Sequence, residues 1–107
     1  MAIPGNWQIH FDWGCTGTYL SVGITFDPGG TWNSGIFNGQ WVELNGEVIF
    51  NFVGLATVYA GNVSGGAAVG IMSTFSGSNG CWYMVKQDVP AAKAAAPSHD
   101  LAGKPAR

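Results

Sequence analysis

The stretch that decides the fold of this chain is QWVELNGEVIFNF, residues 40–52. Its two arms, residues 40–44 and 47–52, are rich in aromatic and β-branched side chains, and Asn45-Gly46 lies between them. A type I′ turn needs a positive φ at both central residues, which Asn and Gly tolerate best. The stretch therefore predicts two antiparallel strands joined by a two-residue turn.

Further stretches of the same kind lie on both sides of this hairpin and are separated by turn signals at near-regular spacing. In residues 7–13 and 18–26 apolar side chains alternate with other side chains, which is typical of half-buried strands. The turn signals include Asp27-Pro28-Gly29-Gly30 and Asn38-Gly39. We expect strands at residues 7–13, 18–26, 31–37, 40–44, 47–52, 57–63, 67–75 and 81–86.

The connections between these strands determine the architecture. Parallel strands need crossovers of about a dozen residues or more, so strands joined by tight turns are antiparallel. Closing about eight of them into a barrel removes the exposed edges of an open sheet. The 17 glycines and the 9% charged residues also argue against helices. We predict an all-β, antiparallel up-and-down barrel of about eight strands in residues 1–87, with a flattened sandwich as the alternative.

The composition changes near residue 88. Residues 88–107 are rich in Ala, Pro and Lys and contain no aromatic side chain, so they bury too little surface to offset the entropy of ordering. We expect a disordered, flexible C-terminal tail. A short helix at residues 91–96 is the alternative, but Pro90 and Pro97 limit its length.

Charge restricts the partners. The four basic residues of the chain all follow residue 85, whereas residues 1–85 carry four acidic residues and no Lys or Arg. Nucleic-acid binding requires a basic surface, so we expect no nucleic-acid partner. No apolar run approaches the ~18 residues of a membrane-spanning helix, so we expect no membrane span. We expect a cytoplasmic protein if the chain is full length, and a secreted or periplasmic one if a signal peptide was removed.

Two cysteines provide a geometric prediction. Cys15 follows the first expected strand and Cys81 begins the last, and in a closed eight-stranded barrel these positions lie at the same rim. We expect Cα atoms about 4.4–6.8 Å apart if the pair is a disulfide, worth about 2–4 kcal/mol in an oxidising compartment. In a cytoplasm they would stay thiols. Neither cysteine lies in a metal-binding motif, so we expect no metal and no cofactor.

The tripeptide Gly-x-Trp occurs four times, and each copy opens an expected strand. Gly relieves backbone strain at a turn, and Trp two residues later can close a barrel end while its indole N–H finds a partner. The simpler interpretation is that these rings pack in the core. The functional interpretation is that some of them face a cavity and stack on a ligand. The copies begin at Gly5, Gly30, Gly39 and Gly80.

A first strand opened by Gly5-Asn6-Trp7, an eight-stranded meander and the return Gly80-Cys81-Trp82 resemble the calycin superfamily of lipocalin, fatty-acid-binding and avidin-type barrels. The resemblance covers residues 5–87, and the size is similar to that of avidin-type barrels. It implies a ligand-binding barrel. Lipocalins pair the first-strand Trp with a basic residue of the last strand, where this chain has Lys86. The avidin biotin-site pattern is not matched, so no biotin site is implied.

Two groups of polar residues raise the alternative of an enzyme. His10 and Asp12 share one strand face, and with Tyr19 they offer a base for an isomerase or cyclase. Glu43 and Glu47 could face each other across the hairpin like the carboxylates of a glycosidase. A solvated surface position is the simpler interpretation of both groups. No nucleophile motif is present, so we name no catalytic residue and favour a protein that is not an enzyme.

The leading hypothesis is a non-enzymatic binding barrel for a small neutral, apolar or aromatic ligand, because the expected barrel is rich in Trp and residues 1–85 have no cationic Lys or Arg side chain. The alternative is an oligomeric structural or protein-interaction module, and a homo-oligomer fits it. Gly and Ala in residues 54–70 leave room for bulky side chains, a ligand or another subunit. The candidate ligand-binding residues are Trp7, Trp32, Trp41, Phe50, Phe52, Tyr59 and Trp82.

Overall fold

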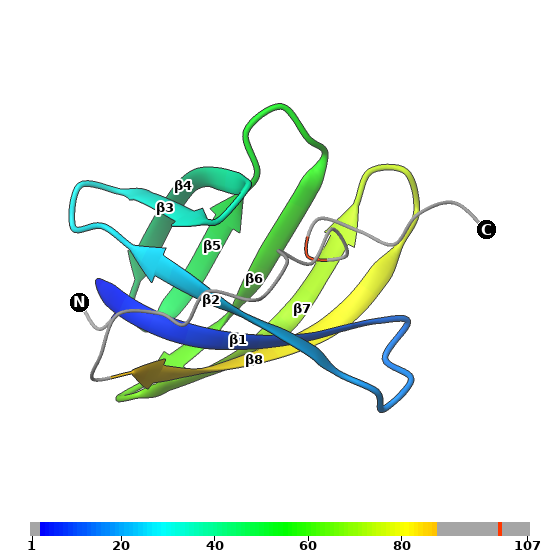
Figure 1. Cartoon of the computed structure of the whole chain (residues 1–107), viewed down its shortest axis with the longest axis horizontal. Coiled ribbons are helices and arrows are strands. Elements are labelled where there is room, and N and C mark those ends of the chain that lie inside the picture. Colours follow the sequence, from blue (N-terminus) through cyan, green and yellow to red (C-terminus); the bar gives the residue numbers. More distant parts are fainter. Residues whose placement is uncertain (1–2, 88–100, 102–107) are drawn as a thin grey trace.

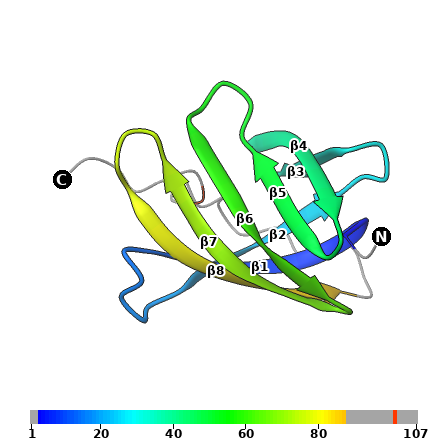
Figure 2. The same cartoon turned by 180° about the vertical axis from the view of Figure 1, so that it is seen from behind.

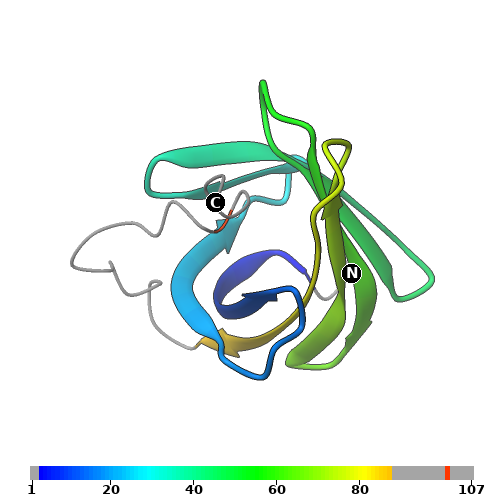
Figure 3. The same ribbon diagram turned by 90° about the vertical axis from the view of Figure 1, so that its right-hand side faces the viewer.

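The computed structural model describes residues 3–87 and residue 101. It shows eight antiparallel strands in a closed barrel, in which each strand pairs with the next and β8 pairs with β1 (Figure 1). Viewed end-on, the strands form a ring (Figure 3). The predicted all-β up-and-down barrel is confirmed, and the sandwich is not formed. The strands are β1 (Gly5–Trp13), β2 (Leu20–Phe26), β3 (Thr31–Ser34), β4 (Phe37–Leu44), β5 (Glu47–Asn51), β6 (Thr57–Ser64), β7 (Ala67–Thr74) and β8 (Asn79–Gln87).

The hairpin between β4 and β5 forms as predicted. Leu44 pairs with Glu47, and the two turn residues have positive φ angles, 53° at Asn45 and 82° at Gly46. These angles are those of a type I′ turn, whose twist matches that of the flanking strands. The turn therefore fixes the register of the two strands.

The barrel has two ends, which we name by what lies there. At the disulfide end, Cys15 and Cys81 are joined by a disulfide with Cα atoms 5.3 Å apart, which agrees with the expected separation. The β1–β2, β3–β4, β5–β6 and β7–β8 connections lie at this end, because the strands alternate in direction. At the N-terminal end β1 begins and β8 finishes, and Asn6 pairs with Gln87. Figure 2 shows β4 to β8 from behind as consecutive neighbours.

One expected turn is wrong. Residues 31–37 do not form one strand, because the chain turns at Gly35, with φ 65°, and β4 begins at Phe37. Gly39, expected in a turn, lies inside β4 with its α-carbon toward the interior. A Cβ there would come within 2.7 Å of Trp32 Nε1 and closer still to the carbonyl oxygen of Asn51. Gly39 therefore serves the packing of an indole ring.

The interior is filled by side chains that alternate along the strands. On β1 the four apolar side chains expected on one face are all buried. Leu20 is an exception to the alternation expected in residues 18–26, because it lies at the start of β2 and is exposed. The expected tail, residues 88–107, lies outside the described residues, except for Leu101, whose side chain is buried.

Candidate functional site

All of the expected ligand-binding residues are buried inside the barrel, and five of them form a continuous set of ring contacts. The Phe50 and Tyr59 rings stack with centroids 5.0 Å apart, and Trp82 lies 6.0 Å from Tyr59. Trp32 meets Phe52 edge-on at 4.7 Å. Such edge-to-face and stacked pairs stabilise the core beyond the area they bury. These rings therefore contact one another.

The indole N–H groups of four tryptophans are directed at the protein's own backbone. Each donates to main-chain carbonyl oxygen at 2.8–3.0 Å. A buried indole N–H without an acceptor would be costly, so these bonds fix the rings as parts of the wall. The acceptors are the carbonyls of Ile3 for Trp7, Asn51 for Trp32, Asp27 and Thr31 for Trp41, and Ile71 for Trp82.

The small residues of β6 and β7 make room for one of these rings. A Cβ on Gly61 would come within 2.8 Å of Trp82 Cζ2 and as close to the α-carbon of Gly70. The Trp82 indole thus lies against glycine backbone, and a larger side chain at either glycine would displace it or the neighbouring strand. Part of the room expected in residues 54–70 is therefore occupied by Trp82.

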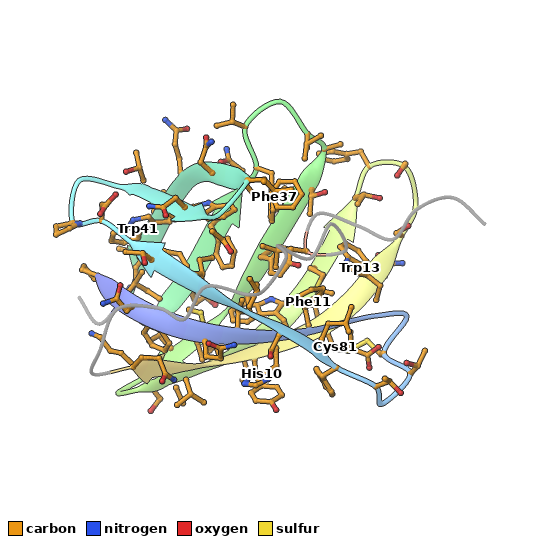
Figure 4. The ribbon with its side chains drawn as sticks, viewed as in Figure 1. His10, Phe11, Trp13, Phe37, Trp41 and Cys81 are labelled. Atoms are coloured by element: carbon orange, nitrogen blue, oxygen red, sulfur yellow. A yellow bond between two sulfur atoms is a disulfide. The ribbon has the colours of Figure 1, made fainter. Side chains whose placement is uncertain are left out.

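Four aromatic residues surround the interior at the disulfide end, and we call this group the aromatic mouth: Trp13, Phe37, Phe52 and Tyr59. The Tyr59 ring lies 5.5 Å from Phe52 and meets Trp13 edge-on at 6.5 Å. Phe37 lies 5.6 Å from Phe52 and is only partly buried. Figure 4 shows Phe37 on β4 and Trp13 on β1, at the end that carries Cys81.

The hydroxyl group of the aromatic mouth is that of Tyr59, which donates a hydrogen bond to the main-chain carbonyl of Leu101. Burial raises the pKa of the Tyr59 phenol well above its ordinary value of 10.0, because the charged form is poorly solvated there. The hydroxyl therefore keeps its proton at neutral pH and acts as a donor. The Leu101 side chain is 1% exposed and belongs to the core cluster.

Sequence reasoning named Phe52 and Tyr59 but missed Trp13, Phe37 and Leu101. Trp13 ends the alternating apolar face of β1, so the sequence predicts that its side chain is buried. The sequence does not indicate that the ring lies at the rim of the barrel. Phe37 was assigned to the end of a strand that actually stops at Ser34. No local pattern signals Leu101, because its partner Tyr59 lies 42 residues away.

The opposite, N-terminal end is closed by Ile3. Its carbonyl accepts the Trp7 indole N–H at 2.8 Å, and its amide donates to Glu43 Oε1 at 3.1 Å. At the same end, Lys86 Nζ lies 5.7 Å from the centroid of the Trp7 ring, where a cation–π attraction operates. Trp7 and Lys86 are also register partners across β1 and β8.

The residues of the enzyme alternative serve other contacts. His10 lies on the outer side of β1 (Figure 4), where its ring stacks on Tyr83 at 4.5 Å, and Tyr19 meets Tyr83 edge-on at 5.2 Å. Asp12 was expected at a solvated surface, but it is buried.

The Asp12 carboxylate holds the β1–β2 connection. It accepts hydrogen bonds from the Thr16 hydroxyl at 2.9 Å and from the Gly17 amide at 2.7 Å. Burial of a carboxylate is tolerated where donors satisfy its oxygens. Asp12 therefore orders the loop that carries Cys15.

The two carboxylates beside the hairpin turn do not face each other. Glu43 pairs with Val48 and Glu47 pairs with Leu44, so their side chains project to opposite faces of the sheet. Within residues 3–87 and 101, no three His, Cys, Asp or Glu side chains gather into a potential metal site. No helix in the same part of the chain has the length and apolar character needed to cross a membrane.

The fold and the aromatic mouth define a small, closed, eight-stranded antiparallel barrel with an aromatic interior and a buried phenolic hydroxyl at the disulfide end. Comparison with family models, with curated proteins and with solved structures finds no match to this chain.

Proposed function

We propose that this chain is a non-enzymatic binding barrel for a small, neutral ligand that carries an apolar group, and that the ligand binds at the aromatic mouth. The observation that supports it most directly is the seating of Leu101. This residue lies outside the eight strands, yet its side chain is buried and its carbonyl accepts a hydrogen bond from Tyr59. The aromatic mouth therefore accommodates a group that is not part of its wall.

The chemistry of the aromatic mouth favours an uncharged ligand. Its members are three hydrocarbon-rich rings and a protonated phenol, and the chain has no Lys or Arg before residue 86. Binding sites of this kind combine apolar walls with a few directed polar groups. The indole N–H groups of Trp7, Trp32, Trp41 and Trp82 already donate to main-chain carbonyls. The hydroxyl of Tyr59 is the group that we propose meets the ligand's acceptor.

A screen against neutral compounds tests this proposal. The melting temperature and tryptophan fluorescence are measured with uncharged amides, ketones and aromatic compounds. A binding compound raises the melting temperature by mass action. The Tyr59→Phe variant, which keeps the ring and loses the donor, should bind carbonyl compounds less tightly, whereas Tyr83→Phe on the outer face should not. No response to any compound, or equal responses from the wild type and Tyr59→Phe, would contradict the proposal.

We also propose that the barrel is of the calycin type. The support is the contact between Lys86 of the last strand and the ring of Trp7, which is the pairing that the resemblance to lipocalins implies. Gly5, with φ 132°, opens β1, and the carbon Cε of Lys86 lies 3.0 Å from where its Cβ would be. The Gly5-x-Trp7 sequence thus leaves space for the lysine side chain to cross the strand.

A second candidate is a homo-oligomeric interaction module, favoured by the outer surface of β4 to β7. Val42, Ile49, Ala60 and Ile71 are successive register partners across these strands, and the valine and both isoleucines are more than half exposed. An apolar row without charge marks interaction sites on soluble proteins. Light scattering tests this candidate: a dimer that Ile71→Lys dissociates supports it, and a monomer at all concentrations rejects it.

A further inference from the structure

The ends of the barrel are closed in two different ways. Ile3 lies two residues before β1 and is held through both its amide and its carbonyl, so it continues the wall of the N-terminal end. Leu101 lies 14 residues beyond Gln87, where β8 finishes, and its carbonyl accepts the hydrogen bond of the Tyr59 hydroxyl. The disulfide end is therefore occupied by a residue that is distant in sequence from the eight strands.

The group seated there has a defined chemistry. It is a branched aliphatic side chain, buried in a core cluster rich in aromatic residues, next to an amide carbonyl that accepts a hydrogen bond from a phenolic hydroxyl. In the described part of the chain, no buried side-chain nitrogen or oxygen lacks a hydrogen-bond partner. If Leu101 departs, the Tyr59 hydroxyl loses its described acceptor, and an incoming molecule that excludes water from the site has to supply one.

We infer that the aromatic mouth is a site for leucine-like amides, including leucyl units of peptides, and that Leu101 of the same chain occupies it as a tethered competitor. This inference rests on the proposed binding function and specifies its ligand class. A tethered group acts at an effective concentration that a free ligand must exceed. Free ligands therefore bind the wild type more weakly than they bind a chain without the leucine side chain.

The first test uses the full-length variant Leu101→Ala and the neutral probe N-acetyl-L-leucinamide, titrated by tryptophan fluorescence. If Leu101 occupies the site about 90% of the time, its removal strengthens probe binding about tenfold. Leu55→Ala is the matched control, because Leu55 lies in the β5–β6 connection at the same end and is 51% exposed. This control should bind like the wild type. N-acetylglycinamide, which lacks the aliphatic side chain, should bind neither variant.

The second test keeps the wild-type chain, so it does not depend on how a variant folds. Methyl groups beside aromatic rings have upfield-shifted proton resonances, and the Leu101 methyl groups should show this shift in the free protein. Excess N-acetyl-L-leucinamide should return them toward the position of a solvent-exposed leucine. Unshifted methyl resonances in the free protein, or probe binding that leaves them shifted, would overturn the inference.

The outcomes separate the two proposals. If neutral compounds bind through Tyr59 but N-acetyl-L-leucinamide does not, the binding function stands and the leucine-like ligand class is wrong. If Leu101→Ala binds the probe no more tightly than the wild type, the competition is wrong. If neither the wild type nor Leu101→Ala binds any neutral compound, the proposed binding function fails, and the inference fails with it.

Discussion

The indole of Trp32 occupies the space that a side chain at Gly39 would need, and its N–H donates to the carbonyl of Asn51 at 2.8 Å. Trp32 and Gly39 are register partners across β3 and β4. This relationship explains why a glycine lies inside β4, where it weakens the strand by itself. It also gives the first prediction.

Replacing Gly39 by Ala should destabilise the barrel by about 1–3 kcal/mol, because the added methyl group overpacks the interior and displaces the Trp32 ring. Gly29→Ala is the control, since nothing lies within 4 Å of the added Cβ there. Urea denaturation followed by tryptophan fluorescence measures both variants. Equal unfolding midpoints for Gly39→Ala and Gly29→Ala would contradict the packing role.

Reducing the disulfide between Cys15 and Cys81 should lower the free energy of unfolding by about 2–4 kcal/mol, because the unfolded chain regains conformational freedom. The measurement compares thermal melts with and without a reducing agent. The double variant Cys15→Ser with Cys81→Ser should match the reduced wild type and should no longer respond to the reducing agent. A response in the double variant would show that the agent acts elsewhere.

Stability should fall at alkaline pH through Tyr59. Burial raises the pKa of its phenol above 10.0 in the folded state, so the folded chain holds this proton more tightly than the unfolded chain. The contribution to stability is complete below pH 10.0 and is lost as the pH rises above that value toward the folded-state pKa.

The Tyr59→Phe variant should lack this part of the loss of stability at alkaline pH, whereas the Tyr83→Phe variant should retain it. Urea midpoints measured at pH 8 and at about pH 11 provide the comparison. The same alkaline loss in Tyr59→Phe as in the wild type would assign the effect to other groups.

Lys86→Ala should cost about 0.5–1 kcal/mol, the range of an exposed cation–π pair, because it removes the ammonium group above Trp7. Lys86→Arg should retain most of this stability, since guanidinium also stacks on aromatic rings. Thermal melting of the two variants checks the difference. An arginine variant as unstable as the alanine variant would attribute the loss to something other than the cation.

Local patterns predicted the strands and the hairpin turn, because both depend on neighbours in sequence. Asn45-Gly46 satisfies two positive φ angles, and this requirement is visible in two residues. Gly39 was misjudged because a glycine that admits an indole is identical in sequence to a glycine that makes a turn. The position of Leu101 depends on a contact with Tyr59, which lies 42 residues away in sequence. A single leucine in an Ala- and Pro-rich segment gives no local signal of such a contact.

The pairing of β1 with β8, from Asn6–Gln87 to Trp13–Gly80, has a consequence for the order of folding. A chain that emerges from the ribosome cannot complete the ring until residue 87 is available, so β1 waits with one edge unpaired while the hairpins form. Contacts between distant strands also form more slowly than hairpins. The bond between Cys15 and Cys81 becomes geometrically accessible when this seam closes. Oxidation thus locks covalently the seam whose closure completes the ring.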